Sequence, residues 1–182
     1  PEGVVLFDTG VSYEMQQDPS SYGQHGAPHM EPFMEALQMS EDQRPEALLA
    51  DIGYEPDDID KVVLSHLHVD HAGNIETFPN AEFLVQQDEL KYAWWPTDPI
   101  QQSFYLEGDF GVLRSHDYNV TPLNGAYDVF GDGRVVCLPT PGHTPGHQSI
   151  RLERSADETV ILGGDAAHLQ QGYDAELVAS YN

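Results

Sequence analysis

The chain reads VVLSHLHVDH at residues 62–71, where an apolar run typical of a buried strand leads directly into three imidazoles and a carboxylate. Histidine nitrogens and aspartate oxygens suit a divalent metal of the zinc type. In an extended turn, residues two apart project to the same side, so His66 and His68 are placed to share one ion. Asp70 and His71 then turn toward a neighbouring position. A polar loop with surface histidines is the alternative, but four metal-competent side chains at this spacing favour a metal site.

Two later segments extend this local signal. Residues 140–147 read TPGHTPGH after an apolar run, and residues 163–168 read GGDAAH after another. Each predicted strand delivers a ligand-type residue, His143 or Asp165, into a Gly-rich turn where the backbone bends and approaches closely. A site assembled from several strand ends holds its ligands rigidly. We therefore expect the three segments to meet in one metal site.

With these motifs the sequence resembles the metallo-β-lactamase fold superfamily. The shared pattern is His-x-His-x-Asp-His, then Gly-His, then an Asp after a strand, and the likeness runs from residue 6 onward. Within the superfamily the sequence is most similar to the N-acyl homoserine lactone lactonases. The stretches that carry this likeness are residues 65–74, 92–96, 140–149 and 164–168. The resemblance implies an α/β fold, an αββα four-layer sandwich, and the alternation of predicted strands and helices fits such layers.

The length of 182 residues suffices for one domain with a core. We expect residues 1–182 to form a single metallo-β-lactamase-like hydrolase domain. The chain starts at Pro1 and stops at Asn182 inside a predicted helix, so both ends look cut. The sandwich is accordingly expected to be incomplete at both termini, as in an internal fragment of a longer protein.

The resemblance implies a site for two divalent ions, with zinc as the default metal. The ligands carried over are His66, His68 and His143 for the first ion, Asp70 and His71 for the second, and Asp165 as the bridge. A further histidine of the family would lie beyond the end of this chain. Iron, manganese or cobalt suit the same ligands, so the sequence does not identify the metal.

The resemblance also implies a reaction. A lactonase of this family opens the lactone ring of an N-acyl homoserine lactone by attack of a metal-bridging hydroxide, since two cations lower the pKa of the shared water. Asp70 resembles the residue that carries the proton to the leaving ring oxygen. The implied protein is therefore a metallohydrolase acting on ester bonds, with quorum quenching as the associated role.

Other histidines and one aspartate need separate interpretation. Many lactonases carry Tyr three residues after the bridging Asp, where it contacts the lactone carbonyl, and here that position is His168, a second catalytic candidate. Asp8 resembles a family residue that orients a ligand histidine, although a turn carboxylate capping its own backbone is the alternative. His147 is read as structural. The histidines without ligand spacing, read as surface residues, are His25, His29 and His116.

The net charge of −24, from 31 acidic and 7 basic residues, restricts the partners. Such a field repels nucleic acid and anionic membranes, which disfavours a nuclease of the same superfamily. A glyoxalase-II-type thioesterase holds an anionic glutathione substrate with Lys or Arg, which are scarce here. A class B β-lactamase typically lacks the final histidine of the first motif, so His71 argues against that role. Another lactone or ester substrate, and a non-catalytic metal-binding fragment, remain open.

The remaining expectations concern surroundings and partners. No apolar run approaches the roughly 20 residues of a membrane span, and no signal peptide is visible. We expect a cytoplasmic protein with a small-molecule lactone as its partner, no nucleic acid and no membrane. Related lactonases are often dimers, which suggests a homodimer. The single cysteine, Cys137, excludes an internal disulfide and reads as a small buried hydrophobe.

Local patterns predict the other elements. Residues 11–39 read as a loop reaching over the site, and residues 95–126 as an irregular aromatic stretch that either lines a pocket or packs under a loop. A helix is predicted over 40–51, with a Ser40–Gln43 capping box, an apolar face of Leu48, Leu49 and Ile52, and an end at Gly53. The further predictions are a helix start at 72–74, a strand at 81–85, a helix at 88–94, and hairpins over 128–138 and 147–162.

Overall fold

The computed structural model describes residues 3–20 and 30–175 and contains two four-stranded sheets. The parallel sheet has the order β1 (Val5–Phe7), β2 (Lys61–Val63), β3 (Glu82–Gln86), β4 (Asn119–Leu123). The antiparallel sheet has the order β5 (Tyr127–Asp128), β6 (Val135–Pro139), β7 (Gln148–Ser155), β8 (Glu158–Leu162). Both predicted hairpins are confirmed, as β5–β6 and β7–β8.

The helices are short. The α-helices are α1 (Tyr13–Gln17), α2 (Glu31–Ala36), α3 (Pro45–Asp51), α4 (Val69–Ala72), α5 (Gln87–Trp94), α6 (Pro99–Gln102), α7 (Glu107–Phe110) and α8 (Gln170–Asp174). The 3-10 turns are η3 (Glu41–Gln43), η4 (Pro56–Asp58), η5 (Ile75–Thr77), η6 (Gly111–Arg114) and η7 (Gly164–Ala166). In the part of the chain that the structure describes, no helix is long and apolar enough to cross a membrane.

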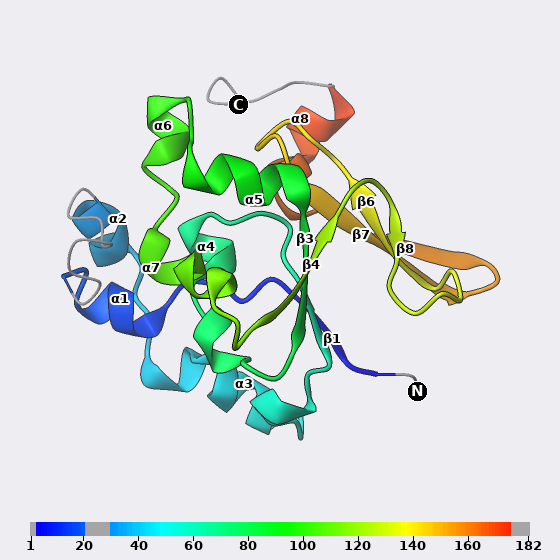
Figure 1. The fold of residues 1–182 in the computed structure, drawn as a ribbon, viewed down its shortest axis with the longest axis horizontal. Helices are drawn as coiled ribbons and strands as arrows, with labels where there is room; N and C mark the ends of the chain where they lie inside the picture. The colour runs from blue at the N-terminus through cyan, green and yellow to red at the C-terminus, as the bar shows by residue number, and fades with distance from the viewer. Residues whose placement is uncertain (1–2, 21–29, 176–182) are drawn as a thin grey trace.

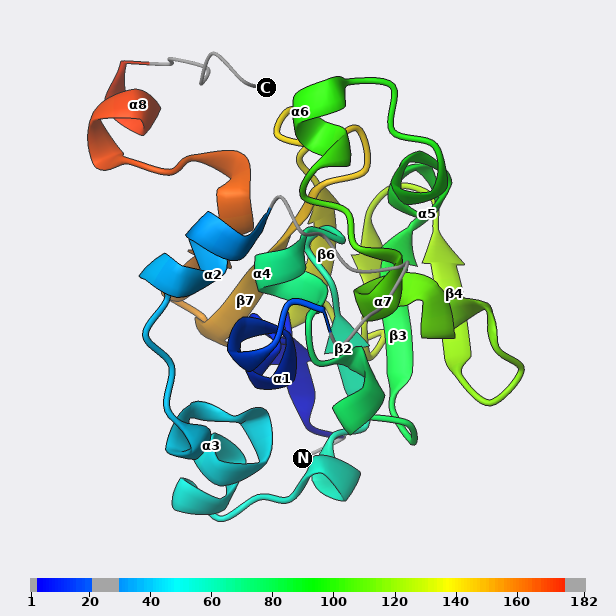
Figure 2. The same ribbon diagram turned by 90° about the vertical axis from the view of Figure 1, so that its left-hand side faces the viewer.

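The elements stack in layers, as the resemblance implied. Figure 1 shows α1 to α4 and α7 on one side of the parallel sheet and the antiparallel sheet on its other side, and Figure 2 shows the helical side turned to the viewer. The α/β layering that the resemblance implied is therefore present. Of the four predicted layers, the outer helical layer beyond the antiparallel sheet does not cover β8 within the described residues 3–20 and 30–175. Ile161 and Leu162 of that strand are 53% and 38% exposed.

The core between the sheets is apolar, and a buried amide, that of Gln148, links the two sheets at its edge. Val63, Leu84, Cys137 and Ile150 are buried there, so the prediction of a buried Cys137 is confirmed. At the edge of this layer, the fully buried Gln148 at the start of β7 donates to the carbonyl oxygens of residues 64 and 84, at 2.8 and 3.0 Å. A side chain of the antiparallel sheet thus bonds to the backbone directly after β2 and in the middle of β3.

Residues after the parallel strands meet at one edge of the sheet, because parallel strands share their direction. Asp8 follows β1, the 65–71 segment follows β2, and α5 follows β3. This edge collects the metal-type ligands that the sequence places after strands.

The predicted helix at 40–51 is present in two pieces. The side chain of Gln43 accepts from the backbone N–H of Ser40 at 2.9 Å, as half of the predicted capping box requires. Arg44 is extended, with φ −65° and ψ 147°, and Pro45 begins α3. A proline disfavours the helical region for the residue before it, so one continuous helix is excluded. Gly53, at φ +83°, ends the helix as predicted.

Two other local predictions are corrected, and a third is confirmed in part. The predicted apolar face holds only for Leu49, since Leu48 and Ile52 are 52% and 69% exposed. The 11–39 segment is not simply a loop, because Ser12 caps α1 through its hydroxyl, 3.1 Å from the N–H of residue 15. Of residues 72–74, Ala72 ends α4, while Asn74 is the N-cap of η5, so the predicted short helix does start here, as a 3-10 turn. Such one-turn helices give no apolar periodicity from which they could be predicted.

The 95–126 stretch contains α6, α7, η6 and β4 rather than an irregular segment. Its aromatic residues are core packing in part: Tyr105 and Phe110 are 8% and 3% exposed. Tyr105 also lies against the ring of His68, with ring centroids 4.6 Å apart. The segment therefore serves packing and borders the predicted metal ligands.

Candidate metal centre

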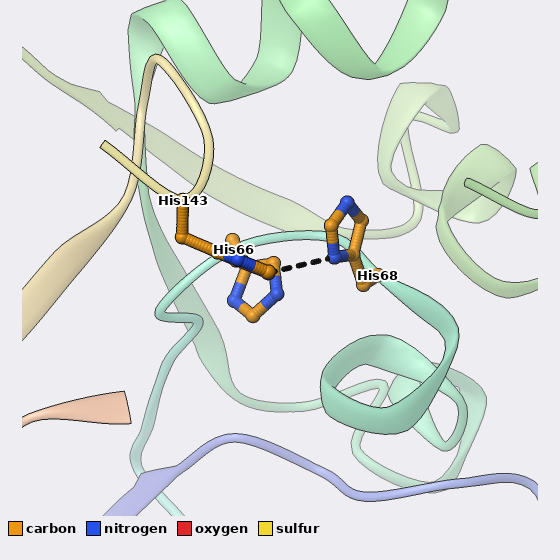
Figure 3. Close-up of side chains that lie close together, drawn as sticks. All are labelled: His66, His68 and His143. Carbon is orange, nitrogen blue, oxygen red and sulfur yellow. Dashed lines mark hydrogen bonds between the residues drawn. The ribbon is translucent and has the colours of Figure 1, made fainter. Parts of the chain in front are cut away.

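Three buried imidazoles from two distant segments converge at the sheet edge (Figure 3). The ring centroids of His66 and His68 are 4.5 Å apart, and that of His143 is 4.8 and 4.9 Å from them. The Nε2 atom of His143 lies 3.1 Å from Nδ1 of His68. One nitrogen from each ring lies within 4.8 Å of the others. The structure thus brings together the three residues that the sequence assigned to a first ion.

A second group adjoins the first. Nε2 of His71 lies 3.5 Å from Oδ1 of Asp165, and the two form a trio with His66 whose ligand atoms lie within 4.8 Å. Oδ2 of Asp165 lies 3.4 Å from Nε2 of His143. The carboxylate of Asp165 therefore stands between the two groups, where the predicted bridge would have to be.

Asp70 lies at the edge of the second group rather than within it. Its carboxylate is 45% exposed, and Oδ2 lies 3.6 Å from Nε2 of His71. Among the described residues, the three-residue groups with ligand atoms within 4.8 Å do not include Asp70. The residue borders the second group at its solvent side, where it can approach both an ion and a bound molecule.

Asp8 orients two of the imidazoles. Its Oδ2 accepts from Nδ1–H of His71 at 2.8 Å and from the Ser65 hydroxyl at 2.8 Å, and Oδ1 accepts from the Ser65 backbone N–H at 2.6 Å. Because the hydroxyl of Ser65 donates to Asp8, its oxygen accepts from Nδ1–H of His66 at 2.9 Å. When neutral, each ring then carries its lone pair on Nε2, facing the centre. This arrangement favours the orienting role over the turn-capping alternative.

The backbone at Asp8 is unusual, with φ +60° in the left-handed region. Asp and Asn are the non-glycine residues that adopt this region most readily. The turn directs the carboxylate from the end of β1 across to the segment after β2. From this position directly after β1, Asp8 reaches both Ser65 and His71.

Charges differ between the two groups. Burial, reinforced by the other histidines, lowers the pKa of His66 well below its usual value, and burial and His143 lower the pKa of His68 to about 3. Burial also lowers the pKa of His71, but hydrogen bonds to Asp165 and Asp8 outweigh it and raise that pKa to about 10. The hydrogen bond with His71 holds the pKa of Asp165 well below its usual range. His66 and His68 are thus neutral near pH 7, the form that binds a metal.

The donor set fits a divalent cation. Nε2 of His66 is buried and has no hydrogen-bond partner among the described residues, which is costly unless another group satisfies it. Tetrahedral zinc with Zn–N bonds of about 2.0–2.1 Å would hold nitrogens about 3.4 Å apart. The separation of 3.1 Å between the His143 and His68 nitrogens is close to that requirement.

His147, read as structural, supports Asp165 from behind. It is fully buried, its Nδ1 lies 2.8 Å from the Thr140 hydroxyl, and its Nε2 accepts from the backbone N–H of Asp165 at 3.1 Å. Burial lowers its pKa to about 4, so the accepting nitrogen is unprotonated. Gly164 has φ +53°, which favours glycine, and a Cβ there would lie only 3.0 Å from that nitrogen.

His168 lies on the open side of the centre. Its Nε2 is 3.3 Å from Oδ2 of Asp165, its ring centroid is 5.3 Å from that of His143, and its side chain is 33% exposed. Of the histidines read as surface residues, His116 is exposed, and His25 and His29 lie outside the described residues.

Sequence reasoning did not single out Glu89 or Gln148. Both are fully buried, and both bond to backbone groups of the 64–67 segment. A signal was available for Glu89, because it shares a helical face with the buried Ala93 four residues later. A charged residue at a core position of a helix is uncommon unless it has partners.

The fold and this site define the class of protein. The family model of the Metallo-beta-lactamase superfamily matches residues 1–177, and the chain belongs to that superfamily.

Within the superfamily the chain is similar to named lactonases. N-acyl homoserine lactonase AttM of Rhizobium radiobacter is 33% identical over 183 residues, which is 100% of this chain and 67% of AttM. N-acyl homoserine lactonase AiiA of Bacillus thuringiensis subsp. kurstaki is 31% identical, over 97% of this chain and 64% of AiiA. The chain therefore spans about two thirds of the length of these relatives.

A solved structure shows the same relationship. An N-acyl homoserine lactone hydrolase with the product N-hexanoyl-L-homoserine bound at its catalytic metal centre superposes with a TM-score of 0.75 at 30% identity. The match covers 97% of this chain and 64% of that one. The resemblance to the lactonase family is thereby confirmed.

Proposed function

We propose that the protein is a metal-dependent hydrolase that opens the lactone ring of N-acyl homoserine lactones. The observation that carries this proposal is the orphaned Nε2 atom of buried His66, in contact with both candidate ion sites. This imidazole stands where the two donor groups meet, and a bound pair of metal ions would satisfy its free nitrogen. The similarity to AttM and AiiA supports the choice of substrate.

The candidate ligands have separate tasks in this proposal. His66, His68 and His143 would hold one ion, His71 and Asp70 a second, and Asp165 would join them. Two bound cations supply a water made acidic enough to act near neutral pH and polarise the carbonyl oxygen. Asp8 and His147 keep His71 and Asp165 in their orientations, which the chemistry needs before substrate arrives.

Asp70 and His168 border the open side and would act on the substrate. Ring opening breaks the bond between the carbonyl carbon and the ring oxygen, which must gain a proton as it leaves. The exposed carboxylate of Asp70, 3.6 Å from Nε2 of His71, would carry that proton. His168, 3.3 Å from Asp165, would donate a hydrogen bond to the carbonyl oxygen as negative charge develops there.

A neutral substrate suits the surrounding charge. Five of the seven basic side chains pair with acidic neighbours outside the centre: Arg44, Lys61, Lys91, Arg151 and Arg154. A glutathione thioester carries carboxylates that the protein's net charge of −24 would repel. An uncharged lactone meets no such repulsion.

Proton release in a pH-stat tests the proposal, because hydrolysis of a lactone yields a carboxylate and one proton. The zinc-loaded protein is given N-hexanoyl homoserine lactone, and then S-lactoylglutathione as a second substrate. Acid release from the lactone that stops on chelation is expected. Release from the thioester alone would move the protein to the glyoxalase-type branch, and no release from either would reject both substrates.

A further inference from the structure

Glu89 is a fully buried carboxylate in the first turn of α5 that belongs to no candidate ligand group among the described residues. Its Oε1 accepts from the backbone N–H of Leu67 at 2.9 Å and from the Tyr105 hydroxyl at 2.8 Å. Its Oε2 accepts from the Thr144 hydroxyl at 2.6 Å, and the Gly146 backbone N–H also bonds to the carboxylate. One side chain therefore gathers donors from three segments of the chain.

These donors are the immediate neighbours of the imidazoles. Leu67 stands between His66 and His68, and Thr144 directly follows His143. Tyr105 reaches His68 by a second route, since its ring packs edge-on at 4.6 Å between centroids. Glu89 is thus bonded beside every member of the trio, and among the described residues it belongs to none of the candidate ligand groups.

The contact between α5 and the loop that carries His143 is close. A Cβ on Gly146 would lie 2.0 Å from the backbone nitrogen of Glu89 and 2.4 Å from its Cα, so only glycine fits. Thr144 and Leu67 are themselves fully buried. The loop has no room to shift independently of the helix.

A buried carboxylate needs such donors. Burial raises the pKa of Glu89, while the bonds from Thr144, Leu67 and Tyr105 act in the opposite direction. Removing the acceptor would leave the N–H groups of residues 67 and 146 buried without a partner, and neither can turn away as a hydroxyl can. The backbone on both sides of the trio would then relax.

We propose that Glu89 is a positioning residue that holds His66 and His68 at a fixed separation from His143, and so sets the affinity of the trio for its metal ion. The inference rests on the proposed metal centre but not on the lactone substrate. A residue that only stabilised the core would affect unfolding without altering the ligand field of a bound ion.

The test is a Co²⁺ titration of the metal-free protein, followed by visible absorption and by competition with a chelator. Glu89→Met keeps the length of the side chain but accepts no hydrogen bond, and we expect it to weaken Co²⁺ binding by roughly 10–100-fold and to alter the absorption bands. Leu113→Ala is the matched control, since Leu113 is a buried core residue on η6. It should lower the melting temperature but leave affinity and spectrum unchanged.

Glu89→Met with wild-type Co²⁺ affinity and spectrum would overturn the inference. If that variant does not fold, the double variant Tyr105→Phe/Thr144→Val replaces it, because it removes both hydroxyl donors and keeps the carboxylate. Weakened binding supports the positioning role, and unchanged binding rejects it. A wild-type protein that binds no metal at all would instead reject the proposed function, so the two failures are distinguishable.

Discussion

Oδ2 of Asp8 lies 2.8 Å from Nδ1 of His71, across 63 residues of sequence. The same oxygen accepts a hydrogen bond from the hydroxyl of Ser65, which in turn is hydrogen-bonded to His66. A single carboxylate directly after β1 thus determines which nitrogen of two candidate ligands carries the lone pair when the ring is neutral. Histidine ligands of metals usually have such an acceptor behind them, and its removal weakens binding.

Asp8→Asn should therefore weaken metal binding. An amide retains one oxygen, so it cannot accept from His71, the Ser65 hydroxyl and the Ser65 backbone in the observed geometry. We expect the affinity for the ion that His71 would hold to fall roughly 10–100-fold. Equilibrium dialysis with zinc analysis measures this, with the exposed Asp57→Asn as the control. Equal zinc stoichiometry and affinity in the two variants would contradict the orienting role.

Metal removal should lower the thermal stability. A ligand that binds only the folded state stabilises it by about 2.7 kcal/mol at a free concentration of 100 times its Kd. Without an ion, the buried Nε2 of His66 again lacks a partner. Calorimetry before and after chelation, and after zinc is restored, checks this. If the chelator leaves the melting temperature unchanged, the folded protein has no metal site.

Substitution of His168 tests whether this residue acts on the substrate or binds a metal ion. His168→Phe removes the proposed hydrogen-bond donor and should lower kcat roughly 10²–10³-fold, the usual cost of losing such a donor, with zinc content unchanged. His168→Tyr restores a donor and should recover most of the rate. Steady-state kinetics with metal analysis measures both. Loss of zinc in the Phe variant would show that His168 acts as a ligand, and a wild-type rate would remove it from the mechanism.

Cys137 should report on unfolding. Burial raises the pKa of its thiol to about 12, so in the native protein it stays protonated while an unfolded thiol ionises near pH 8.5. The unfolded state then binds fewer protons, and Cys137 makes stability fall between these pH values, by at most about 1.4 kcal/mol per pH unit.

Thiol titration at pH 8 should show no reaction in the folded protein and one equivalent in denaturant. Urea unfolding at several pH values, compared with Cys137→Ala, isolates the contribution of the thiol from that of other groups. Rapid native labelling, or identical pH slopes in the two proteins, would refute a buried thiol.

Local sequence was sufficient for the ligand motifs. The alternation in residues 66–71, the glycines at 142 and 146, and Asp165 after a strand all express short-range geometry, and the strands before them are recognisable as apolar runs. The hairpins followed for the same reason, since a turn and two alternating runs are contiguous. Helix boundaries near Arg44 and Pro45 were less predictable, because one proline can either begin a helix or interrupt one.

The contacts that complete the centre were decided only by the tertiary structure. Asp8 reaches His71 across 63 residues, His143 approaches His68 across 75, and Gln148 pairs the carbonyl of residue 64 across 84. The burial that turned Glu89 into a shared acceptor likewise depends on how α5 packs against two loops. Sequence specifies which side chains suit a metal, whereas distances and lone-pair directions arise only when remote strand ends are brought to one edge. The physical reason is that hydrogen bonds act over about 3 Å. The sequence pattern of one segment carries no information about its distance from another segment.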